Sequence, residues 1–152
     1  MSQDTSFFSV ALEKLAGLSP NQKPEWGNMT PQHMVEHLVG TWMISNGRAE
    51  AEQVVSDEEI DEKLAFLRSD IPFAKNLKSV AHKNGALLPL RKNNVTDAVE
   101  QLRKEMLVFD AYFEEHPEAR PIHPVFGPLD RIDWLRFQEK HMRHHLRQFN
   151  LM

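Results

Sequence analysis

Apolar residues recur at intervals of three and four along several stretches of the chain, and each stretch predicts an amphipathic helix. The clearest stretch covers residues 96 to 115, and two others cover residues 30 to 46 and 130 to 149. A shorter stretch with the same spacing covers residues 6 to 16. Alternation with a period of two, which would predict strands, is nearly absent. The pattern therefore predicts four principal helices.

Residues that can cap a free backbone N–H stand where these helices are expected to begin. Thr30 accepts such a bond, and Pro31 suits the first position of a helix. Ser56 and Glu59 have the spacing of a capping box, which predicts a short extra helix. Asp130 marks the start of the last helix. Together these signals predict an all-α four-helix bundle with extra short helices.

Two segments lack a sustained period. Residues 69 to 94 contain two prolines and a glycine and are predicted to form a long irregular connection, a feature that is often functional. The apolar run at residues 86 to 88 is compatible with a short extended segment instead. Residues 117 to 129 form a proline-rich loop. Since no repeat or internal boundary is visible, we expect a single domain over residues 1 to 152.

Composition and charge narrow the class of protein. Hydrophobic residues make up 41% of the chain and charged residues 26%, as in soluble globular domains. The formal net charge of −4 does not favour a nucleic-acid binder, which usually has a basic excess. No apolar run approaches the ~18 residues of a membrane span, and the start lacks the features of a secretory signal. We therefore expect a cytoplasmic protein. The absence of cysteine excludes disulfides and thiolate metal ligands.

The candidate chemistry lies in the histidines. Two of the possible pairs among the eight histidines are spaced four residues apart, namely His33 with His37 and His141 with His145. Side chains with this spacing share one face of a helix, with Cβ atoms about 5–6 Å apart. Two imidazoles placed in this way can bind one metal ion at about 2.0–2.1 Å.

A helical wheel places His141 and His145 at the centre of the buried face of the last helix. At about 100° per residue, both lie within about 20° of Trp134. The opposite face carries a basic stripe, made of Arg136, Lys140, Arg143 and Arg147. Two buried imidazoles need partners, because an unsatisfied buried polar group costs about 1–3 kcal/mol. A metal ion would satisfy both rings, and hydrogen bonds to Gln138 or to water are the alternative.

The remaining histidines are less central. His37 lies closer to the apolar stripe of its helix than His33 does, which makes His37 the better third ligand. Three histidines leave coordination positions open, whereas structural zinc usually has four protein ligands. His144 lies at the edge of the buried face. His123, in an H-P-V-F-G loop, is expected either to cap the pocket or to lie in a buried turn.

Two segments resemble a known family. The sequence WGNMTPQHMVEHLVG and, far downstream, HPVFGPLDRIDWLRFQEKHMRHHLRQF resemble the DinB/YfiT-like superfamily of metal-dependent proteins, and within it a small bacterial subfamily of unknown function. The resemblance implies a four-helix bundle with one crossover connection that forms a homodimer. It also implies one divalent metal ion, nickel or zinc, bound by His37, His141 and His145. Gln148 follows these ligands as in the family's HHxxQ pattern.

The resemblance implies an enzyme that acts on a small molecule. Hydrolysis and transfer to a low-molecular-weight thiol cosubstrate are both open, since a bound metal ion lowers the pKa of a coordinated water or thiol. His144, His123 and Gln148 are the candidates for orienting the substrate or moving protons. The alternative is a non-catalytic, metal-stabilised bundle that binds a ligand or a partner, with the basic stripe as its interface. Neither reading includes a membrane or a nucleic acid as partner.

Overall fold

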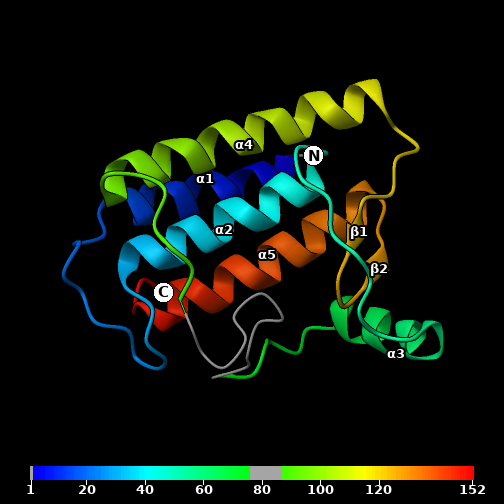
Figure 1. Ribbon diagram of the computed structural model, residues 1–152, viewed down its shortest axis with the longest axis horizontal. Coiled ribbons are helices and arrows are strands. Elements are labelled where there is room, and N and C mark those ends of the chain that lie inside the picture. Colours follow the sequence, from blue (N-terminus) through cyan, green and yellow to red (C-terminus); the bar gives the residue numbers. More distant parts are fainter. Residues whose placement is uncertain (1, 76–86) are drawn as a thin grey trace.

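The computed structural model describes residues 2–75 and 87–152. Helix α2 packs against α4 and α5, and α1 packs against the same two helices (Figure 1). This arrangement confirms the predicted all-α bundle. The four helices of the bundle are α1 (Ser2–Ala16), α2 (Pro31–Ser45), α4 (Val95–Glu115) and α5 (Arg131–Gln148).

Helices α2 and α4 run in the same direction, so the chain must return along the bundle between them (Figure 1). This return is the crossover connection that the family resemblance implied. It contains the predicted short helix, α3 (Asp57–Leu67), which packs on α5. Residues 76–86 of the connection lie outside the described residues, and the predicted extended run at 86–88 begins among them. Residues 87–90 form no strand.

The helix starts are capped as the sequence predicted. The Thr30 side chain accepts a hydrogen bond from the backbone N–H of His33 at 3.1 Å. The Glu59 carboxylate accepts hydrogen bonds from the backbone N–H and the hydroxyl of Ser56, at 3.3 and 3.0 Å. The Asp130 carboxylate accepts from the backbone N–H of Asp133 at 2.9 Å. These local bonds set where α2, α3 and α5 begin.

The proline-rich loop before α5 contains more structure than the sequence predicted. Two short strands, β1 (Ile122–His123) and β2 (Gly127–Pro128), pair in an antiparallel register. Strands of two residues are too short to give a periodic signal, which is why the loop was predicted to be irregular. The Trp134 indole N–H donates to the carbonyl oxygen of Pro121 at 2.9 Å. This bond attaches the strand pair to the first turn of α5.

Aromatic and aliphatic side chains fill the space between the four long helices. The Trp42 ring lies 5.3 Å from the rings of both Phe8 and Phe109, edge to face in each case. This packing holds α2 and α5 in fixed positions, and the three-histidine site lies between these two helices.

None of the helices in the described part of the chain has the length and apolar character that a membrane span needs.

Two glycines of the α2 region are expected to respond to alanine in opposite directions. Gly47 has a φ of +83°, and a Cβ there would lie 2.5 Å from Cε1 of Tyr112. We expect Gly47→Ala to lower the free energy of unfolding by about 1–3 kcal/mol. Gly40 lies inside α2, where a Cβ meets nothing within 4 Å. Gly40→Ala is expected to raise the free energy of unfolding by about 0.5–1 kcal/mol. Urea unfolding of both variants measures the two effects, and changes of the same sign would contradict this account.

Candidate metal centre

Three imidazole rings converge between α2 and α5. The Nε2 atom of His141 lies 3.0 Å from Nε2 of His37 and 3.1 Å from Nε2 of His145. One ring nitrogen from each histidine lies within 4.8 Å of the other two, close enough to hold one metal ion. Donors that share a tetrahedral ion at about 2.0–2.1 Å lie about 3.3 Å apart. The two separations from His141, 3.0 and 3.1 Å, are within a few tenths of an ångström of this value.

Local structure explains how the chain brings these rings together. His141 and His145 are one helical turn apart on α5, and only 8% and 6% of their surfaces are exposed. The Phe137 ring, one turn earlier, stacks on His141 with ring centroids 4.9 Å apart. Phe73, from the segment after α3, meets the same imidazole edge to face. These apolar contacts hold the imidazole of His141 so that its Nε2 atom faces the other two rings.

Hydrogen bonds determine which nitrogen of His145 carries the proton. The Gln148 amide group donates to the carbonyl oxygen of Trp26 at 3.1 Å. The Oε1 atom of Gln148 therefore accepts a hydrogen bond from Nδ1 of His145 at 2.7 Å. A neutral His145 therefore has a lone pair on Nε2, and this lone pair points toward the other histidines. An outer partner of this kind is what metal-binding histidines usually have.

His141 also remains neutral. Burial, reinforced by the neighbouring histidines, lowers its pKa well below the ordinary value. Its Nδ1 atom is buried and has no hydrogen-bond partner among the residues that the structure describes. If Nδ1 carries the proton, the lone pairs of His141 and His145 face each other at 3.1 Å. If Nε2 carries it, a buried lone pair is left unsatisfied. A cation among the three Nε2 atoms removes the repulsion, so these residues fit a divalent ion.

His144 lies beside the three rings. Its ring centroid is 4.9 Å from that of His145 and 5.3 Å from that of Trp26. Burial lowers the pKa of His144, although a hydrogen bond to the backbone of Phe73 opposes this shift. A neutral, half-buried imidazole is therefore available next to the site. Its predicted part in catalysis stays a prediction.

His123 lies behind the site, in a buried turn. Its Nδ1 atom accepts hydrogen bonds from the backbone N–H groups of Val125 and Phe126, at 3.0 and 3.3 Å. The Phe137 ring lies 4.3 Å from the His123 ring, measured between centroids, and stacks on His141. Of the two alternatives for this loop, the hydrogen bonds favour the buried turn. Burial lowers the pKa of His123 to about 3.

The low pKa of His123 predicts part of the acid sensitivity of the fold. Because the unfolded chain has the ordinary pKa of 6.5, the unfolded state takes up the proton first. The stabilising contribution of neutral His123 is therefore complete above pH 6.5 and declines as the pH falls toward 3. Between pH 7 and pH 5 this decline amounts to about 2 kcal/mol.

We expect His123→Asn to flatten that decline, because asparagine offers the same backbone N–H groups an acceptor but does not titrate. Urea unfolding at pH 7 and pH 5 measures the effect. His116→Asn serves as the control, because His116, the residue before Pro117, is exposed. A His123→Asn protein with the wild-type difference between the two pH values would contradict the prediction.

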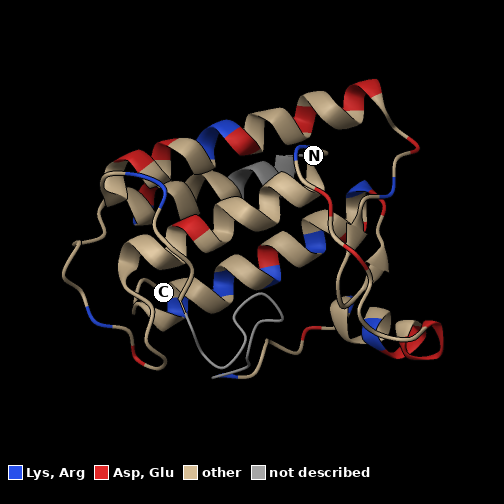
Figure 2. Ribbon diagram, in the orientation of Figure 1, with Lys and Arg blue, Asp and Glu red and all other residues tan. Residues whose placement is uncertain are grey.

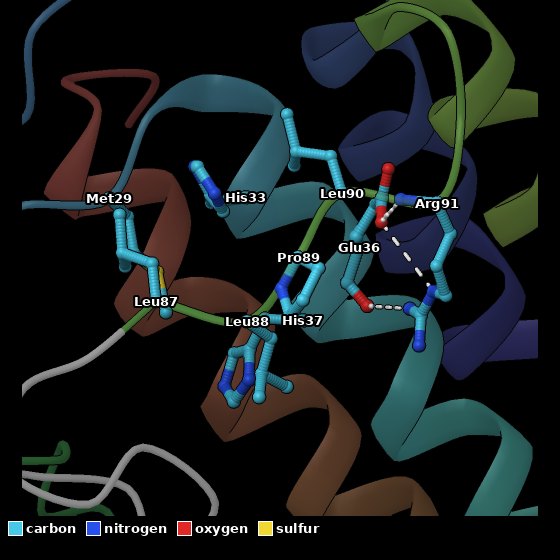
Figure 3. A pocket seen from close by; sticks show the side chains of 9 residues that line it. All are labelled: Met29, His33, Glu36, His37, Leu87, Leu88, Pro89, Leu90 and Arg91. Carbon is cyan, nitrogen blue, oxygen red and sulfur yellow. Dashed lines mark hydrogen bonds and ion pairs between the residues drawn. The ribbon is translucent and has the colours of Figure 1, made fainter.

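A small cavity opens beside His37 (Figure 3). Its volume is about 20 Å³, which is room for one water molecule. His33 lines this cavity but does not join the three-histidine group, and its Nδ1 atom lies 2.6 Å from the Thr30 hydroxyl. The residues around the cavity are Met29, His33, Glu36, His37, Leu87, Leu88, Pro89, Leu90 and Arg91.

The buried carboxylate of Glu36 is a feature that sequence reasoning missed. It accepts hydrogen bonds from the backbone N–H groups of Arg91 and Lys92, at 2.8 and 3.0 Å. Burial alone would raise its pKa, but the hydrogen bonds from Gln32, Lys92 and Arg91 bring the net pKa below the ordinary value.

Of the other histidines, His116 is exposed, and His82 lies outside the described residues.

Comparison with protein families identifies a relationship that covers nearly the whole chain. The family model described as the DinB superfamily matches residues 6–149, which is nearly the whole chain. Searches of curated proteins and of solved structures give no significant match.

Proposed function

Because this chain belongs to the DinB superfamily, we propose that it binds one divalent metal ion through His37, His141 and His145 and acts on a small molecule. The observation that carries this proposal is the convergence of three Nε2 atoms, with separations of 3.0 and 3.1 Å from His141. Neutral imidazoles suit nickel and zinc equally, so both metals are candidates.

Three protein ligands leave coordination positions open, which is typical of catalytic rather than structural sites. A divalent ion held by these three residues would supply Lewis-acid chemistry toward a water, thiol or carbonyl group. The chain's own residues prepare the site for this chemistry. Gln148 orients His145, the Phe137 ring covers one face of His141, and the cavity beside His37 admits a group the size of water.

We assign proton transfer to His144 in preference to His123. His144 is half-buried beside His145, and its neutral imidazole can accept a proton. His123 uses its Nδ1 atom on the backbone of its own turn and is not part of the three-histidine cluster. Gln148 has a positioning role, because it contacts His145 and the Trp26 carbonyl group. Hydrolysis and thiol-dependent transfer both fit these roles.

Metal analysis tests the proposal. Protein purified without chelator, or loaded with nickel or zinc, should contain about one equivalent of metal by mass spectrometry of the digested protein. Less than about a tenth of an equivalent, with none gained on addition, would overturn the proposal. Loaded protein should then be assayed on esters, and on electrophiles with and without a low-molecular-weight thiol. Activity that strictly requires the thiol excludes simple hydrolysis. Stable metal binding without either activity supports the non-catalytic bundle instead.

A further inference from the structure

Four long apolar side chains line the cavity beside His37, and we call them the apolar mouth: Met29, Leu87, Leu88 and Leu90. In Figure 3, Met29 lies against Leu87, and Leu88 lies beside the imidazole of His37. Leu88 is 47% exposed and Leu90 is 44% exposed. Large apolar residues exposed singly need no explanation, but Leu88 and Leu90 are exposed together at one cavity, whose lining also includes Met29 and Leu87.

The apolar mouth is attached to the helix that carries His37. Glu36, the residue before His37, is 6% exposed and accepts the backbone N–H groups of Arg91 and Lys92. The Arg91 guanidinium group donates in turn to the Glu36 carbonyl oxygen at 3.2 Å (Figure 3). Because the donors to the Glu36 carboxylate are backbone N–H groups, these hydrogen bonds fix the path of the main chain at Arg91 and Lys92. The position of Leu88 relative to His37 is therefore set by α2 itself.

The size and charge of the opening limit what can bind there. The cavity holds only about one water-sized group, so the part of a ligand that enters it beside His37 must be small. The rest of the ligand must then extend across the apolar mouth. Among the residues that line the cavity, the charged side chains of Glu36 and Arg91 pair with each other at 3.5 Å. The lining therefore offers little to a ligand that carries a charge outside its metal-binding end.

We propose that the apolar mouth selects the substrate: it binds the aliphatic part of a small molecule whose compact polar end is held at the three histidines. Met29, Leu87 and Leu88 contact the aliphatic part, and Glu36 is a positioning residue that holds the mouth over the site. The inference rests on the proposed function, because the polar end is bound through the metal ion.

Binding of two hydroxamates to the zinc-loaded protein tests the inference. Acetohydroxamate and hexanohydroxamate share the metal-binding group and differ by four methylenes. Each methylene that leaves water contributes up to about fourfold in affinity, so we expect hexanohydroxamate to bind at least about tenfold more tightly. Titration calorimetry measures both affinities, and the zinc content of each sample is measured alongside.

Leu88→Ser should remove most of this tenfold preference, and the zinc content of the same sample shows whether the metal site is still filled. Leu107→Ser is the matched control, since Leu107 is 58% exposed on α4 and should keep the preference. Glu36→Gln has one acceptor oxygen instead of two and should lower the preference to about threefold without loss of zinc. Glu139→Gln, on α5, is its control.

The failures of the two proposals are distinguishable. Zinc-loaded protein that binds both hydroxamates equally, or a Leu88→Ser protein that keeps the preference, overturns the apolar mouth and leaves the metal site standing. Protein that takes up no zinc overturns the metal site and the mouth together. Circular dichroism of each variant confirms that it is folded before its affinities are compared.

Discussion

Replacing His145 by alanine is expected to lower the affinity for zinc or nickel by more than about a hundredfold. The variant loses one of three nitrogen ligands. An outer partner of a ligand typically contributes only 10–100-fold, so Gln148→Ala should weaken binding by about tenfold or somewhat more. His116→Ala, at an exposed histidine, should leave the affinity unchanged. Competition with a chromophoric chelator gives the three affinities on one scale.

Thermal unfolding supplies a second measurement for the same variants. A ligand that binds only the folded state at about 100 times its Kd stabilises that state by about 2.7 kcal/mol. Zinc should therefore raise the Tm of the wild-type and His116→Ala proteins but not that of His145→Ala. A folded His145→Ala protein that keeps full metal occupancy would show that His145 is not a ligand.

Much of the fold follows from local signals that the sequence contains directly. The apolar spacing of residues 96 to 115 and the caps at Thr30 and Asp130 depend on residues within one or two turns of each other. The observed bounds of α4 and α5 agree with those predictions to within a residue. Helix α1 begins at Ser2 rather than at residue 6, because residues 2–5 have little apolar spacing and helix ends are the least certain part of a prediction from sequence.

The site was predictable in part. The wheel of the last helix places His141 and His145 on its buried face, and both are buried. His37 lies off the apolar stripe of its own helix, yet its Nε2 atom is 3.0 Å from His141. A wheel describes one helix at a time, so it does not show which neighbour covers the edge of a stripe. The family resemblance supplied what the wheel lacked.

The walls of the site were not predictable from the sequence. Trp26 and Phe73 lie in loops without a period, and they meet His144 and His141 through tertiary contacts only. The Glu36 carboxylate accepts a hydrogen bond from the backbone N–H of Arg91, which is 55 residues distant along the chain. Buried carboxylates are rare unless paired. A glutamate inside an otherwise apolar stretch of α2 was therefore the available signal.

The largest loss of stability is expected from Trp134→Ala. The Trp134 side chain is fully buried, and its ring lies 5.7 Å from Phe137 and 5.4 Å from His123. Truncation of a buried tryptophan costs about 3–5 kcal/mol, because it removes apolar contacts and leaves a cavity. The indole N–H also holds the Pro121 carbonyl group, so the strand pair β1–β2 loses its attachment to α5. Urea unfolding monitored by circular dichroism measures the loss.

Two further variants separate the parts of this effect. Trp134→Phe keeps most of the apolar volume but loses the hydrogen bond, and it should cost about 1–3 kcal/mol. Ile132→Ala, two residues earlier on α5 and 56% exposed, should change stability by less than about 0.5 kcal/mol. Trp134 touches Phe137 rather than a histidine of the metal site, so folded Trp134→Phe should bind zinc with nearly wild-type affinity. Equal losses in Trp134→Ala and Ile132→Ala would show that Trp134 does not anchor the strand pair. A Trp134→Phe protein without zinc affinity would mean that the position of Phe137, and not only the three histidines, determines metal binding.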